Sequence, residues 1–272
     1  MMHRILLYLL GVMKAIFLPI TKFLEYIGGL GILFWQTCLY VPSALPFTKK
    51  SKAKYIVAQL KKIAFDALPI VILMAFLLGT ILALQAAKQL ERFGASLYIA
   101  NLVGISLSRE IGPILISIII AGRTGSSTTS EIGTMLVTEE LTALKAMGID
   151  PIQILVMPKM VAMLIGLPAL VLIGDLVGIA AGFFVGCGLL GIPFGDYYAQ
   201  TVKVMSLTHI WVGIRKCFSF AIIITMIGCY RGFCISGGAE GVGRETTNSV
   251  VHAIVSIIAV NSLFTIVFFY AR

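Results

Sequence analysis

Two adjacent charges inside an apolar run, Arg109 and Glu110, are the residues best suited to carry chemistry in this sequence. Residues 93–122 contain no other Asp, Glu, Lys or Arg. A charge in such a run is costly in a bilayer, so it marks either a functional pathway or an internal ion pair that positions two helices. Neighbouring side chains on a helix point about 100° apart, so we expect the two charges to have different partners. Pro113 follows and predicts a kink that would open space beside them.

A second intramembrane acid, Asp175, accompanies a series of glycines at four-residue spacing. Small residues at that spacing occupy one helix face and allow two helix backbones to approach closely. The series therefore predicts helix packing, either within the chain or between two copies of it. Its members are Gly174, Gly178, Gly182 and Gly186.

Motifs of enzyme chemistry are largely missing from the sequence, which contains no HExxH, Walker A or GxSxG pattern. The run Gly125-Ser126-Ser127 suggests an intramembrane serine protease, but no histidine is in an arrangement that can be tied to it. The five cysteines form no CxxC pair and mostly lie in apolar runs, so they predict neither a disulfide nor a metal site. We expect no catalytic residue, metal or cofactor in this chain.

The composition places these residues in a membrane. Of the 272 residues, 59% are hydrophobic and 12% are charged, against about 25% charged in an average soluble domain. The apolar runs are long and do not alternate, so helices are favoured over a barrel. The net charge of +9 is concentrated in a block with six lysines between Lys49 and Lys62. Such a block is typical of a cytoplasmic segment beside a membrane, and we do not expect nucleic acid binding.

Five stretches are apolar enough to span a bilayer, which needs about 20 residues. The fourth is the weakest, because its first half carries His209, Arg215 and Lys216. We expect Arg215 and Lys216 to snorkel to the outer headgroups, with a functional role as the alternative. The predicted spans are residues 67–87, 93–122, 160–190, 208–234 and 246–271.

Residues 1–48 are expected to lie on or dip into the inner leaflet, although the uncharged run 26–48 permits a sixth crossing. A crossing would leave basic residues on the outer side, against the positive-inside tendency. With the lysine block inside, residues 123–159 and 231–245 are predicted to be cytoplasmic, with a helical pattern over 130–147. Residues 88–92, residues 190–208 and the C-terminus are then outside. The whole chain, residues 1–272, is predicted to be one domain, with a transmembrane bundle over residues 67–271.

One stretch resembles the signature of the MlaE-type (YrbE) permease family. It reads SREIGPILISIIIAGRTGSSTTSEIGTMLVTEELTALKAMGIDP, over residues 108–151. The matching motifs are R-E-x-G-P, A-G-R-x-G, E-I-G-x-M, a glutamate pair and M-G-x-D-P. Similarity continues more loosely to the end of the chain, through G-V-G-R-x-T-T over residues 241–247. Residues 1–48 are the weak part of the match.

The resemblance implies an all-α integral membrane protein with an interfacial elbow helix, five spans and a cytoplasmic coupling helix between the second and third. That family supplies the non-catalytic permease of ABC complexes that move phospholipids between bacterial inner and outer membranes. The implied partners are a second copy of the chain, an MlaF-type ATPase that holds ATP and Mg, and an MlaD-type MCE-domain protein. The implied location is the inner membrane. The positions that match the coupling region are Glu131, Glu139, Glu140 and Lys145, although a solvated helix face would explain them as well.

For a lipid permease, Glu110 is expected to face a polar compartment that holds the headgroup. It would meet an ammonium headgroup, be neutralised by Arg109 or Arg244, or be protonated by burial. The apolar candidates for contact with lipid tails are Leu78, Leu82 and Ile114. A permease for sterol or another hydrophobic solute would share every one of these motifs, and a plastid lipid permease would share most of them. An ion-coupled secondary transporter would need none of them.

Overall fold

The computed structural model describes residues 21, 24–40 and 50–270, and every regular element in this part of the chain is a helix. Five of the described helical segments are long and apolar enough to cross a membrane, which confirms the predicted count and helical class. Four of the five are longer than the predicted spans, because polar residues at their ends continue the helices beyond the apolar runs, whereas the fourth matches its predicted span within one residue at each end. These segments are Lys54–Phe93, Ser96–Val137, Ile152–Leu189, Leu207–Phe233 and Gly238–Tyr270.

The spans are built from α-helices joined by short tighter or wider turns. The first contains α2 (Lys50–Ile63), the turn Phe65–Ala67 and α3 (Leu68–Leu90). The second contains α4 (Ile99–Ser106), the π-helical turn η4 (Leu107–Ile111), α5 (Gly112–Ile120), the π-helical turn η5 (Ala121–Gly125) and α6 (Ser126–Val137). The third contains η6 (Ile152–Val156), α8 (Met157–Phe183) and η7 (Phe184–Leu189), and the fourth and fifth are α10 (Leu207–Phe233) and α11 (Gly238–Tyr270).

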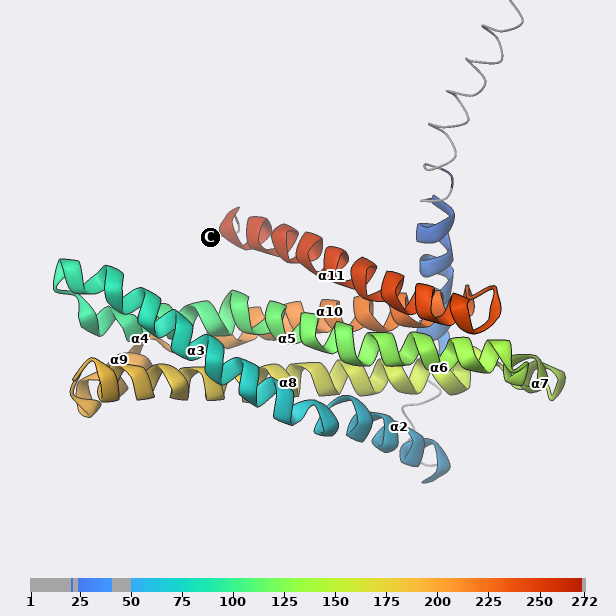
Figure 1. Ribbon diagram of the computed structural model, residues 1–272, viewed down its shortest axis with the longest axis horizontal. Coiled ribbons are helices and arrows are strands. Elements are labelled where there is room, and N and C mark those ends of the chain that lie inside the picture. The colour runs from blue at the N-terminus through green and yellow to red at the C-terminus, as the bar shows by residue number, and fades with distance from the viewer. Residues whose placement is uncertain (1–20, 22–23, 41–49, 271–272) are drawn as a thin grey trace, which may run out of the picture.

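Two shorter helices mark the opposite ends of the bundle. The helix α7 (Glu140–Ala146) joins the second and third spans, and α9 (Phe194–Val204) joins the third and fourth. Figure 1 shows α7 and α9 at opposite ends of the long axis. The helix α9 was not predicted from the sequence. The helical pattern predicted over residues 130–147 is divided between two helices, α6 and α7, because the backbone breaks at Glu139, where φ is 61°.

The central helix α8 packs through its glycines. A Cβ added at Gly79 of α3 would collide with the carbonyl oxygen of Gly178, so the two backbones touch there. A Cβ at Gly174 would meet Ile116, and one at Gly182 or Gly186 would meet Val103 or the ring of Tyr197. The glycine series thus packs α8 against α3, α4, α5 and α9 within one chain. Of the two interpretations left open by the sequence, packing within the chain is the one that these contacts support.

A helix over residues 24–40 lies across the long axis of the bundle (Figure 1). One stripe of this helix, including Leu33 and Thr37, is buried against the bundle, whereas Ile32 and Trp35 are exposed. Tyr40 at its end donates a hydrogen bond of 2.6 Å to Asp150, which raises the pKa of the Tyr40 phenol. The interfacial position of this helix stays a prediction. The rest of the predicted interfacial segment, residues 1–20, 22–23 and 41–48, lies outside the described residues.

Candidate functional site

Glu110 pairs with Lys216 of α10. The Nζ of Lys216 lies 2.6 Å from Oε2 of Glu110. The Lys216 side chain is 0% exposed and that of Glu110 is 34% exposed, so the pair lies at the inner wall of an opening. The expectation that Lys216 would snorkel to the headgroups is therefore wrong, whereas Arg215 beside it is exposed. A buried ammonium needs a partner, and Glu110 provides one.

The helix α11 completes the polar cluster around Glu110. Asn261 Nδ2 lies 3.3 Å from Glu110 Oε2, and the Thr265 hydroxyl lies 3.2 Å from the same oxygen. Three donors, one from α10 and two from α11, thus converge on one carboxylate oxygen. The π-helical turn η4, which carries Glu110, inserts an extra residue into the second span, and such turns frequently occur at functional sites.

Arg109 and Glu110 line a cavity of about 270 Å³ together with two aromatic rings at the end of α11. The other lining residues are Thr265, Phe268 and Phe269. Arg109 forms no ion pair with any residue in the described part of the chain. Two cations, Arg109 and Lys216, therefore accompany one carboxylate, which leaves one positive charge unbalanced beside an aromatic wall. The arrangement can receive a molecule that is anionic at one end and apolar at the other.

The remaining predicted lining residues are not all brought to this cavity. Leu82 lines a separate cavity of about 170 Å³ with Leu102 and Ser106. Leu78 and Ile114 are half-buried, and Ile114 lies one turn after Glu110 on α5. Arg244 is 66% exposed and precedes Asn261 by 17 residues (261 − 244) on α11, which is about 25 Å along a helix. Arg244 therefore does not neutralise Glu110, and the sequence missed Lys216 as the partner.

The predicted coupling residues divide into two groups. Glu139, Glu140 and Lys145 are exposed on or beside α7, and the Thr138 hydroxyl donates to Glu140. Glu131 lies instead on α6 and bridges α2 and α8, with Lys62 at 2.9 Å and Lys159 at 2.8 Å. Glu139, Glu140 and Lys145 present a charged surface at one end of the bundle, whereas Glu131 links α2, α6 and α8. The coupling role of all four stays a prediction.

Comparisons with known proteins decide the family. The family described as Permease MlaE matches residues 56–267. This chain belongs to the MlaE permease family. A probable ABC transporter permease of Rickettsia prowazekii is 42% identical over 214 residues, covering 79% of this chain and 83% of the relative. A probable ABC transporter permease of Synechocystis is 33% identical over 203 residues, covering 75% and 77%. The intermembrane phospholipid transport system permease protein MlaE of Haemophilus influenzae is 28% identical over 215 residues, covering 79% and 82%.

In this MlaE-family permease, Asp175 lies directly behind the turn that carries Glu110. Asp175 is 7% exposed, and a Cβ added at Gly112 would collide with its Oδ1. That oxygen has no hydrogen-bond partner among the described residues. A side chain larger than glycine at position 112 would push either the carboxyl or the turn, so Gly112 and Asp175 fix the position of η4 against α8.

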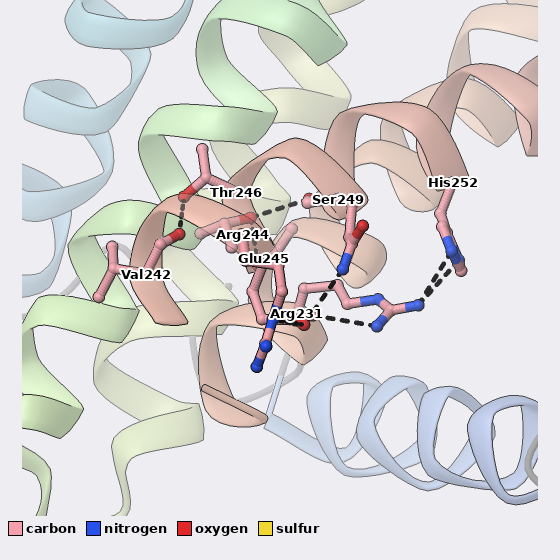
Figure 2. A network of polar contacts seen from close by, with 10 residues as sticks. Arg231, Val242, Arg244, Glu245, Thr246, Ser249 and His252 are labelled. Atoms are coloured by element: carbon pink, nitrogen blue, oxygen red, sulfur yellow. Dashed lines mark hydrogen bonds and ion pairs between the residues drawn. The ribbon is translucent and has the colours of Figure 1, made fainter. Parts of the chain in front are cut away.

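A second polar network, which sequence reasoning missed, holds the permease's helix 24–40 against α10 and α11. Figure 2 shows Arg231 between Glu245 and His252. Its guanidinium lies 3.0 Å from Glu245 Oε2, 3.0 Å from His252 Nδ1 and 4.7 Å from the ring centre of Tyr26. An arginine over an aromatic ring is stabilising. The only sequence signal was the placement of Arg231 and Glu245 on either side of a glycine-rich turn.

Proposed function

We propose that this ABC transporter permease moves phospholipids between the inner and outer membranes of a bacterial envelope, as a non-catalytic subunit. The observation that carries the proposal is the cavity in which Arg109 and Glu110 adjoin Phe268 and Phe269, with Lys216 buried behind Glu110 as its partner. The relative from Haemophilus influenzae, an intermembrane phospholipid transport system permease, supports the same substrate class.

The charges of the cavity suit a phosphodiester headgroup. Such a phosphate carries one negative charge, and the site has one positive charge in excess because two cations accompany one carboxylate. Arg109 can donate two parallel hydrogen bonds to phosphate oxygens, a geometry that guanidinium favours. Lys216 neutralises Glu110 and so removes the repulsion that a free carboxylate would exert on the phosphate. The phenyl rings of Phe268 and Phe269 then provide an apolar surface for the acyl chains.

The partner assignments belong to the same proposal. The exposed charges of α7 suit docking of an MlaF-type ATPase, which would hold ATP and Mg and supply the energy. The outward face of α11 is strongly apolar and exposed at Val255, Ile258 and Leu263, and we assign it to lipid and to contact with a second copy of the chain. An MlaD-type MCE-domain protein would sit at the α9 end, on the outer side of the inner membrane.

The test is to purify the tagged complex from membranes, extract the bound lipid and identify it by mass spectrometry. We expect phospholipid at a stoichiometry that falls in Arg109→Gln and Lys216→Gln but not in Arg215→Gln, which removes a charge from an exposed neighbour. Recovery of sterol instead of phospholipid would contradict the substrate assignment. In reconstituted vesicles, transport should require ATP and the ATPase subunit, and transport driven by an ion gradient alone would contradict the ABC mechanism.

A further inference from the structure

A second polar cavity, of about 150 Å³, lies between α2, η5, α6 and α8, away from the Glu110 cluster. Its polar lining residues include Lys62, Arg123, Thr124, Ser127, Glu131 and Lys159. Arg123 follows Glu110 by 13 residues (123 − 110) along the second span, which is about 20 Å on a helix. The cavity therefore lies toward the α7 end of the bundle and cannot belong to the Glu110 site.

The charges in this cavity do not balance. Glu131 accepts from Lys62 at 2.9 Å and from Lys159 at 2.8 Å, so one carboxylate serves two ammonium groups. Arg123 donates to the backbone carbonyl of Lys62 at 3.2 Å and forms no ion pair with any described residue. Three cations against one carboxylate leave two positive charges in excess. The excess is partly desolvated, because the Lys159 side chain is only 4% exposed.

Hydrogen-bond donors in the cavity are also in excess. The Thr124 hydroxyl is buried, with the residue 6% exposed, and it has no hydrogen-bond partner in the described part of the chain. The guanidinium of Arg123 has five N–H donors. One of them donates to the backbone oxygen of Lys62. A buried hydroxyl without a hydrogen-bond partner lowers the stability of the fold. The presence of such a hydroxyl beside uncompensated cations indicates a ligand that is rich in hydrogen-bond acceptors.

We propose that this cavity binds a phosphate group, either of a phospholipid headgroup or of free phosphate. Phosphate offers several acceptor oxygens and negative charge, which match the surplus of donors and cations. The volume of about 150 Å³ is roughly that of five molecules in liquid water, enough for one tetrahedral oxyanion. If the ligand is a phospholipid, the cavity is a second binding site for the headgroup, at the α7 end of the bundle and separate from the Glu110 cavity. This phospholipid assignment rests on the proposed function.

The matched pair Lys62→Gln and Lys61→Gln tests the site in the purified complex. Both changes remove one positive charge from the same turn of α2, but Lys62 lines the cavity whereas Lys61 lines an apolar groove. Calorimetric titration with inorganic phosphate, and flotation with phosphatidylglycerol and phosphatidylcholine vesicles, supply the two ligand arms. We expect Lys62→Gln and Arg123→Gln to weaken binding about tenfold, the loss expected for one charge-assisted hydrogen bond, and Lys61→Gln to weaken it little.

Two further variants keep the test decisive if a lysine variant folds poorly. Thr124→Val preserves shape and charge but removes the hydroxyl, so it should weaken phosphate binding without lowering thermal stability, because the hydroxyl has no partner to lose among the described residues. Glu131→Gln removes the carboxylate that competes for both lysines, so it should strengthen binding. Loss of phosphate and phosphatidylglycerol binding together supports a site for the phosphate group, and loss of the lipid alone supports a headgroup site.

Equal effects of Lys61→Gln and Lys62→Gln would show that only surface charge acts, and would overturn the proposal. Unchanged binding in both Thr124→Val and Arg123→Gln would overturn it as well. Transport is not measured in this test, so phosphate binding by a chain that moves no phospholipid would refute the proposed function and leave the site standing.

Discussion

Replacing Lys216 by Gln should remove the ion pair with Glu110 while leaving most of the helix bundle folded. The change removes a fully buried ammonium at 2.6 Å from Glu110 and leaves the carboxylate with Asn261 and Thr265 as donors. Removing one partner of a buried ion pair costs about 3–5 kcal/mol. Because Glu110 is 34% exposed, water compensates part of this loss, and we expect about 1.5–3 kcal/mol, the range for hydrogen bonds to charged groups.

The same change should reduce transport, because an uncompensated Glu110 repels a phosphate headgroup. We expect the affinity for phospholipid to fall roughly 10-fold, which corresponds to about 1.4 kcal/mol of binding free energy. The double variant Glu110→Gln with Lys216→Gln removes both charges, so it should recover much of the thermal stability lost in the single variant. The recovered fraction is the coupling energy of the pair, measured by a double-mutant cycle.

The assay is ATP-driven transfer of fluorescent phospholipid by the reconstituted complex, together with thermal unfolding in detergent. Arg215→Gln is the control, because it removes a charge from an exposed neighbour on the same helix. Additive losses in the cycle would show that Lys216 and Glu110 do not interact. Lys216→Gln with the transport and stability of Arg215→Gln would refute the reasoning.

Three other changes test separate parts of the structure. Gly112→Ala should destabilise the fold by about 1–3 kcal/mol, the usual cost of overpacking. Asp175→Ala should relieve only part of this loss in thermal unfolding, because the added Cβ also meets the backbone oxygen of Leu107, and no relief at all would mean that Asp175 does not limit the space at position 112. Charge reversal of Glu139 and Glu140 to Lys should reduce co-purification of the ATPase while insertion of the permease is unchanged, and normal co-purification would remove α7 from the coupling surface. In a variant without native cysteines, Lys54→Cys should resist an impermeant thiol reagent added outside and Tyr198→Cys should react, whereas the reverse pattern would invert the predicted topology.

The five spans could be predicted because uncharged runs of membrane length leave few alternatives to helices. Glu110 could be singled out for the same reason, since a lone acid in such a run is conspicuous. Its partner could not be predicted, because Lys216 lies 106 residues away in the chain and near a predicted span end. Only the packing of η4 against α10 shows that this lysine is buried.

Local irregularities also escaped sequence reasoning. The break at Glu139 requires a positive φ at a residue other than glycine, which is uncommon and carries no composition signal. The helix α9 lies in a segment whose apolar content is too low for a span, so only its connecting role was predicted. Glu131 was grouped with Glu139 and Glu140 by the family resemblance, whereas the structure places its carboxylate against two lysines from other helices.

Photo-crosslinking from the wall of the Glu110 cavity tests the central claim most directly. A photoreactive phenylalanine analogue would replace Phe268, which lines the cavity, or Leu176, which is exposed on the surface of α8. After irradiation of the complex in native membranes, mass spectrometry would identify the lipid attached at each position. We predict phospholipid at position 268 in an amount that falls several-fold in the Arg109→Gln background, with no such dependence at position 176. Equal crosslinking at both positions, unaffected by Arg109→Gln, would contradict a phospholipid site built by these charges.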